Sequence, residues 1–62
     1  MGRYTVEYEC AHRVGVWRED EENPGGFADP NMAVARAYRI SMNRGGRPVR
    51  VMDTWTGEPY YV

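Results

Sequence analysis

The chain has 62 residues, with eight arginines, no lysine, nine acidic residues and a formal net charge of −1. A domain this small has little room for a deep substrate pocket and its supporting side chains, which argues against an enzyme. The apolar fraction of 42% and the eight aromatic residues suffice for one folded domain over residues 1–62, which excludes general disorder.

The single cysteine, Cys10, excludes an internal disulfide framework. Small secreted domains usually need such a framework, so we expect a protein of a reducing, cytoplasmic compartment. No apolar run approaches the ~20 residues of a membrane span, so we expect no membrane partner.

Residues 3–10 alternate between apolar and polar side chains, which is the period of a half-buried β-strand. The alternation resumes over residues 13–18, which predicts a second strand or an extension of the first. The tripeptide Ala11-His12-Arg13 would then form a turn or a bulge between them. A hairpin is the preferred interpretation, and one long bent strand is the alternative.

A loop is predicted next, because the four consecutive acids at 19–22 repel one another and Pro24-Gly25-Gly26 favours a turn. Asp29 is placed to cap a helix, and Pro30 suits the first helical position, where a missing N–H costs nothing. Phe27, just upstream, is expected to pack back on the helix.

The helix is predicted to run to about Asn43 or Arg44 and to end at Gly45-Gly46. Its helical spacing divides the side chains into two sides. The apolar arc is expected to hold Ala33, Val34, Ala37, Tyr38, Ser41 and Met42, and the opposite side Arg36, Arg39 and Asn43.

The last third of the chain predicts a hairpin, with an alternating strand over 47–53, a turn at Thr56-Gly57 and a returning strand over 58–62. Pro48 and Pro59 cannot donate to a strand ladder, so each belongs at a strand start or on an edge. The fold class is therefore α+β, with a three- to four-stranded antiparallel sheet, one helix on one face and the order β(β)αββ.

Cys10 and His12 are the only soft metal ligands, and no further soft ligand completes a zinc site. They also lack a third group to orient them as a nucleophile pair. We therefore expect no metal, no cofactor and no catalytic residue, with Cys10 in the core and His12 in a turn.

Glu7 and Glu9 lie on one face of the first strand, about 7 Å apart by strand geometry. That spacing suits paired carboxylates, but the favoured interpretation is a solvated face that pairs with Arg50 or another cross-strand arginine.

Charge is distributed unevenly along the chain. Residues 1–31 hold three arginines and seven acids, a net charge of −4, and residues 32–62 hold five arginines and two acids, a net charge of +3. We therefore expect an acidic end and a basic end. Four aromatic residues are too many for one small core, so one or two of them are expected to be exposed. The four are Trp17, Trp55, Tyr60 and Tyr61.

The stretch 46–53 followed by Thr56-Gly57-Glu58 resembles the closing hairpin of many short bacteriophage and prophage proteins, and the opening Tyr4-Thr5-Val6-Glu7-Tyr8 is similar to theirs as well. Proteins of this size class include the anti-CRISPR inhibitors, which bind surveillance complexes or nucleases, often through acidic surfaces. The resemblance implies that residues 19–22 carry such a role. The basic C-terminal half favours a local acidic patch over mimicry of DNA by the whole surface.

The expected function is that of a phage-encoded, non-enzymatic inhibitor in the cytoplasm of a bacterial host. It would dock on a host protein or nucleoprotein complex through an acidic patch and block nucleic-acid binding. The residues expected to bind the partner are Glu7, Glu9, Trp17, Glu19, Asp20, Glu21 and Glu22.

The alternative is a small nucleic-acid-binding or regulatory module that uses an arginine stripe on the helix and the following strand. Its residues would be Arg36, Arg39, Arg44, Arg47 and Arg50. A further option is an assembly protein that adds residues 60–62 to a partner sheet. The expected state is a monomer or a weak homodimer.

Overall fold

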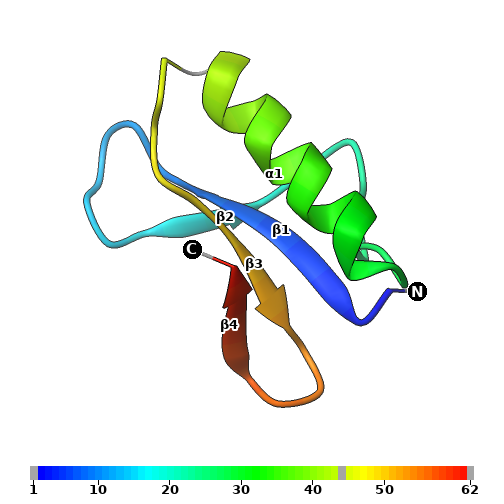
Figure 1. The fold of residues 1–62 in the computed structure, drawn as a ribbon. Coiled ribbons are helices and arrows are strands. Elements are labelled where there is room, and N and C mark those ends of the chain that lie inside the picture. Colours follow the sequence, from blue (N-terminus) through cyan, green and yellow to red (C-terminus); the bar gives the residue numbers. More distant parts are fainter. Residues whose placement is uncertain (1, 44, 62) are drawn as a thin grey trace.

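The computed structural model, which describes residues 2–43 and 45–61, shows an α+β fold with one helix and a four-stranded antiparallel sheet. The strands lie side by side in the order β2-β1-β3-β4, and α1 crosses one face of the sheet (Figure 1). The elements in chain order are β1 (Tyr4–Glu9), β2 (Trp17–Glu19), α1 (Pro30–Asn43), β3 (Val49–Asp53) and β4 (Glu58–Tyr61). The fold class expected from the sequence is confirmed.

β1 and β2 form a hairpin, so the preferred interpretation of the N-terminal region is confirmed over one bent strand. The second strand is shorter than predicted, because the segment before Trp17 forms the connecting loop. Gly15 adopts a left-handed φ of 86° there, and Val14 is 93% exposed. The alternation before Trp17 therefore falls on exposed loop residues and not on a strand.

The ends of α1 follow the predicted capping. The Asn31 N–H donates to Asp29 Oδ1 over 2.9 Å, which satisfies one of the exposed donors of the first turn. At the other end the Gly46 N–H donates to the Ser41 carbonyl over 2.7 Å, with Gly46 at a φ of 81°. Arg44, the alternative last residue, lies outside the described residues.

The buried stripe of α1 differs from the predicted arc. Ala33, Ala37 and Ile40 are buried, whereas Tyr38 and Met42 are 61% and 69% exposed. The two alanines bring the helix close to the sheet, and the large Tyr38 side chain is left on the flank of α1. The predicted arc is therefore wrong in its outer half, and it omitted Ile40.

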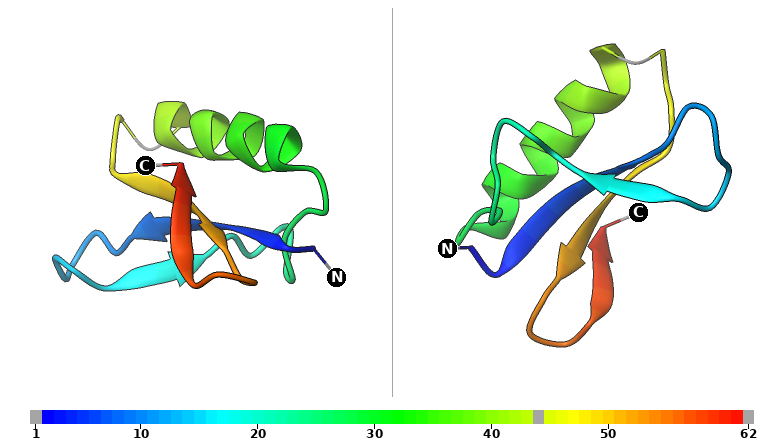
Figure 2. Two further views of the ribbon diagram at one scale, coloured as in Figure 1. Left: turned by 60° about the horizontal axis from the view of Figure 1, so that its bottom comes forward. Right: turned by 180° about the vertical axis from the view of Figure 1, so that it is seen from behind.

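The core lies between α1 and the face of the sheet that it covers, while the other face is open (Figure 2). Val6 and Val51 are directly paired at its centre, and both are essentially inaccessible. Phe27 packs against this core, and its N–H donates to the Tyr4 carbonyl over 2.7 Å. The remaining buried apolar side chains are Tyr4, Tyr8, Ala33, Ala37 and Ile40.

The C-terminal hairpin also follows the prediction. Pro48 directly precedes β3, and Pro59 lies in β4, an edge strand that pairs only with β3. A shift of register between Val51 and Met52 leaves Tyr60 as an extra residue opposite them. Within residues 2–43 and 45–61, no helix is both long and apolar enough to cross a membrane.

Candidate functional site

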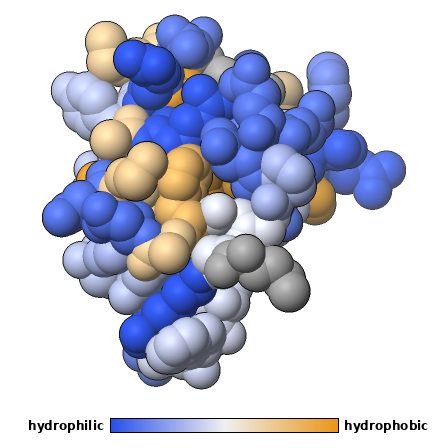
Figure 3. Space-filling model, turned by 90° about the vertical axis from the view of Figure 1, so that its right-hand side faces the viewer, coloured by the Kyte–Doolittle hydropathy of each residue, from blue (hydrophilic) through white to orange (hydrophobic). Residues whose placement is uncertain are grey.

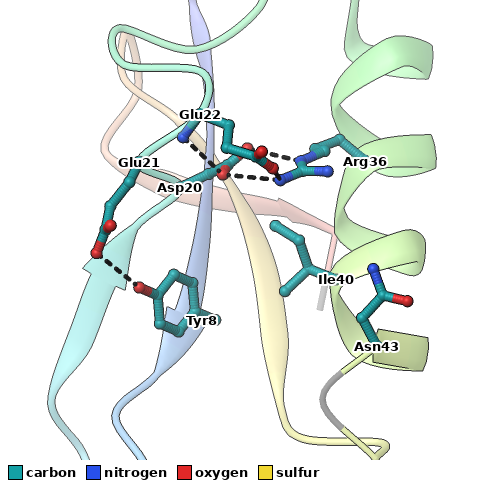
Figure 4. Close-up of a pocket in the computed structure, with 7 residues that line it drawn as sticks. All are labelled: Tyr8, Asp20, Glu21, Glu22, Arg36, Ile40 and Asn43. Atoms are coloured by element: carbon teal, nitrogen blue, oxygen red, sulfur yellow. Dashed lines mark hydrogen bonds and ion pairs between the residues drawn. The ribbon is translucent and has the colours of Figure 1, made fainter.

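The acidic loop (Glu19–Glu22), whose first residue is the last of β2, is held to α1 by a buried ion pair. Asp20 is 3% exposed, and its carboxylate accepts two bonds from Arg36, Nε to Oδ2 over 2.8 Å and Nη2 to Oδ1 over 3.2 Å. Asn23 Nδ2 donates a third bond over 2.7 Å. Figure 4 shows the guanidinium of α1 reaching across to the loop. Asp20 was expected on the exposed surface, and the structure corrects this, because the carboxylate anchors the loop from inside.

The arginine also fixes the charge of this carboxylate. The Arg36 hydrogen bond, supported by Asn23 and by the Glu22 N–H, holds the pKa of Asp20 below its ordinary value despite burial. The same pair raises the pKa of Arg36. Both groups are therefore charged at neutral pH, as a buried pair requires to be stable.

The other three acids of the loop are exposed, and each has one partner. Glu22 pairs with Arg36, and Glu21 accepts a hydrogen bond from the Tyr8 hydroxyl over 3.3 Å (Figure 4). Glu19 accepts from the Gly25 N–H over 2.7 Å, which ties the two ends of the loop together. The loop therefore presents three carboxylates in fixed positions.

Glu7 and Glu9 lie on the open face of the sheet, as predicted. Glu7 is directly opposite Glu19 on one side and Arg50 on the other, and Arg50 Nε donates to its Oε1 over 2.7 Å. The expected cross-strand pairing with Arg50 is thus confirmed, and it offsets the repulsion between Glu7 and Glu19, which lie directly opposite each other. Glu9 instead accepts from the Gly15 N–H over 2.9 Å.

Trp17 lies opposite Glu9 and is half-buried. The Arg50 guanidinium stacks on its ring at 4.2 Å from the centroid. This cation–π contact holds the indole against the sheet, so Trp17 is part of the open face.

The predicted arginine stripe is not one surface. Arg36 is bound by Asp20 and Glu22, and Arg50 is bound by Glu7. Arg39 and Arg47 are exposed and have no ion pair within the described part of the chain, and Arg44 lies outside it. Two of the five arginines are therefore used inside the fold.

The expected separation into an acidic and a basic end is also corrected. Every ion pair in residues 2–43 and 45–61 joins a residue of 1–31 to an oppositely charged residue of 32–62. The antiparallel pairing of β1 with β3, and the packing of α1 beside the acidic loop, place opposite charges together. The partners are Arg3–Asp53, Arg36–Asp20, Arg36–Glu22 and Arg50–Glu7.

Cys10 was expected in the core, and the structure corrects this, because the residue follows β1 and is half-buried. Hydrogen bonds from the His12 backbone and then from Arg18 lower the pKa of its thiol. His12 is exposed in the loop, as predicted. Among the residues that the structure describes, no group of three or more His, Cys, Asp or Glu is placed to hold a metal.

The sequence interpretation missed a second buried carboxylate. Asp53 is 8% exposed and accepts two bonds from Arg3, Nε over 2.9 Å and Nη2 over 2.8 Å. Arg3 in turn stacks on the Trp55 ring at 4.5 Å. The alternation of the strand could have revealed it. Asp53 lies two residues after Val51 and four after Val49, so it faces inward as they do, and an inward carboxylate needs a partner.

Comparisons with known protein families, with curated proteins and with solved structures gave no match for this chain.

Proposed function

We propose that the protein is a non-enzymatic binding protein, an inhibitor of phage origin that docks on a nucleic-acid-handling protein of a bacterial host. The observation that supports this is the acidic surface formed by Glu19, Glu21 and Glu22, which the Asp20–Arg36 pair fixes to the helix. The partner surface is a basic groove that otherwise contacts phosphates, so occupation by carboxylates blocks nucleic acid.

The fixed loop favours binding because less conformational entropy is lost when a partner docks. Arg36 contributes by orienting Glu22 while neutralising Asp20, so the exposed charge of the loop remains negative. The open sheet face continues this surface through Glu9, whose partner is a backbone N–H.

The test is capture of a partner from bacterial lysate, followed by displacement of nucleic acid from the purified partner. Glutamine replaces the loop acids, because its amide oxygen keeps the hydrogen bonds while the charge is lost. The triple variant Glu19→Gln, Glu21→Gln, Glu22→Gln is expected to lose capture and displacement, and capture by the native chain should weaken with rising salt.

Glu58→Gln is the control for loss of a surface carboxylate outside the acidic loop, because Glu58 is exposed on β4 and has no ion pair in the described part of the chain. It should bind as the native protein does. Equal capture by the triple variant and the native chain would refute the acidic-surface proposal.

A further inference from the structure

An aromatic groove lies on the flank of α1 opposite the Asp20–Arg36 pair. It is open, has a volume of about 430 Å³, and is bounded by α1, the segment before β3 and the end of β4. Rings from three different elements, Trp17, Tyr38 and Tyr61, contribute to its walls. Its other lining residues are Ser41, Gly46, Arg47, Pro48 and Val49.

The fold holds the rim of this groove in place. The Gly46 N–H donates to the Ser41 carbonyl over 2.7 Å, and Ser41 Oγ donates to the Arg47 carbonyl over 3.3 Å. These bonds fasten the segment before β3 to the last turn of α1, so the backbone of Arg47 is fixed beside the rings. Tyr38 reaches the groove because the alanine-lined core leaves it on the helix flank.

The rings and the arginine that line the aromatic groove indicate which class of ligand it can bind. Within residues 2–43 and 45–61, no carboxylate lines the aromatic groove and Arg47 has no ion pair. Flat rings beside an unneutralised guanidinium suit a ligand that has both planar rings and negative charge. Its volume falls in the usual range of small-ligand sites.

Three other hollows among the described residues lack several rings beside an arginine without an ion pair. One of them contains Arg39, but its single ring, Phe27, packs against the core. The cleft of Figure 4 is lined by Asp20, Glu21 and Glu22, and the guanidinium at Trp55 is already bound by Asp53. The side shown in Figure 3 is mostly hydrophilic, with a small apolar area near its centre.

We propose that the aromatic groove binds single-stranded nucleic acid, with bases stacked on Tyr38 and Tyr61 and a phosphate held by Arg47, while Trp17, stacked on Arg50, forms part of the wall. Base-paired strands keep their bases stacked on one another, so only unpaired bases can lie against these rings. Such binding shows little sequence preference, because every base has a face that stacks. The site is independent of the acidic surface proposed above.

The experiment measures the anisotropy of a labelled (dT)10 oligonucleotide titrated with the full chain at low salt. Tyr38→Ala is expected to weaken binding about tenfold, which is within the range for loss of one stacking ring. Tyr38→Phe keeps the ring and should bind as the native chain does. Tyr38 is 61% exposed, so both variants should fold, and circular dichroism is the check.

Arg47→Gln and Arg39→Gln form the matched charge pair, since both arginines are exposed and only Arg47 lines the groove. Arg47→Gln should weaken binding several-fold and lower the salt dependence, whereas Arg39→Gln should not. The triple glutamine variant of the acidic loop should still bind the oligonucleotide, which separates the two proposals.

Three results would overturn the proposal. They are no binding of (dT)10 at low salt, equal losses in Arg39→Gln and Arg47→Gln, and displacement of (dT)10 by an uncharged proline-rich peptide that binds more tightly. The last would assign the groove to a protein partner, because proline-rich segments also dock on aromatic grooves.

Discussion

Arg36 connects α1 to the acidic loop through two carboxylates, one buried and one exposed. The exposed partner contributes little to stability, since water screens such a pair. The buried partner matters more, because an unpaired Asp20 would remain a charge with low access to water. At the residue scale, the integrity of the loop therefore depends on one guanidinium.

Replacement of Arg36 by methionine should lower the free energy of unfolding by about 2 kcal/mol, a value reduced from that of fully buried pairs because Arg36 is partly exposed. Arg39→Met is the control on the same helix, and it should change stability by no more than about 0.5 kcal/mol. Urea unfolding followed by circular dichroism gives both values. Equal losses in the two variants would show that the pair does not stabilise the fold.

Acid should destabilise the protein through Asp20 and Asp53, because Arg36 and Arg3 hold the pKa of each carboxyl below its ordinary value. A carboxyl with a lowered folded-state pKa stabilises the fold above its unfolded pKa, and this contribution is lost as the pH falls through the folded value. We expect the contribution of these groups to be complete near pH 6 and to decline below about pH 4.

Asp53→Asn removes one of the two titrating groups. It should be less stable than the native chain at pH 6, yet lose less stability between pH 5 and pH 3. Urea midpoints across this range give the comparison. A native chain with the same stability at pH 5 and pH 3 would contradict the assigned ion pairs.

The acids of the candidate site were recognisable from sequence as a charged, turn-bounded run, and the exposure of Glu21 and Glu22 in a loop followed from that. The burial of Asp20 was not recognisable, because its partner lies 16 residues away on a helix whose rotation is set by packing. The groove was missed for the same reason, since its rings come from three elements.

The connection from β2 to α1 is fastened to β1 at the element scale. Tyr4 and Phe27 exchange backbone hydrogen bonds of 2.9 and 2.7 Å, and Gly26, directly before Phe27, has a φ of 80°. A Cβ on Gly26 would lie 2.2 Å from the Tyr4 carbonyl oxygen. Only glycine therefore allows this segment to approach the strand.

Gly26→Ala should cost several kcal/mol, most of the stability of so small a domain, because it combines backbone strain with a clash against β1. Gly15→Ala shares the left-handed φ, but its Cβ would meet open space. In this control only backbone strain should lower the free energy of unfolding, by about 1–2 kcal/mol. Thermal unfolding by circular dichroism measures both, and similar melting temperatures would refute the close approach.

The elements themselves were largely predictable, and local chemistry explains why. Asp29 with Pro30 marked the start of α1, Gly45-Gly46 marked its end, and alternation marked three of the four strands correctly. Local signals misplaced the start of β2, because Val14 and Val16 alternate with polar or small residues although they lie in a loop. They also misplaced the buried stripe of α1, because small alanines define that stripe while larger apolar residues are exposed.

At the scale of the whole molecule, both edges of the sheet are poorly suited to pairing with another chain. β2 has three residues, and β4 carries Pro59 and a register shift. Short strands, proline and bulges are the features that prevent edge-to-edge association. This weighs against the option of adding residues 60–62 to a partner sheet, and Val62 lies outside the described residues.

We expect sedimentation to show a monomer throughout the micromolar range. A concentration-dependent dimer that Tyr61→Lys dissociates would show instead that β4 is an interface. Arg13→Gln, in the exposed loop after β1, is the control for a change of surface charge.

Each tryptophan lies against an arginine that a carboxylate holds in place: Trp17 against Arg50, and Trp55 against Arg3. The two indoles therefore act as separate intrinsic reporters, one on the β1–β2 hairpin and one on the turn between β3 and β4. Emission spectra of the two single-tryptophan proteins would follow each region during unfolding. Coincident transitions would establish that hairpins and helix unfold as one cooperative unit.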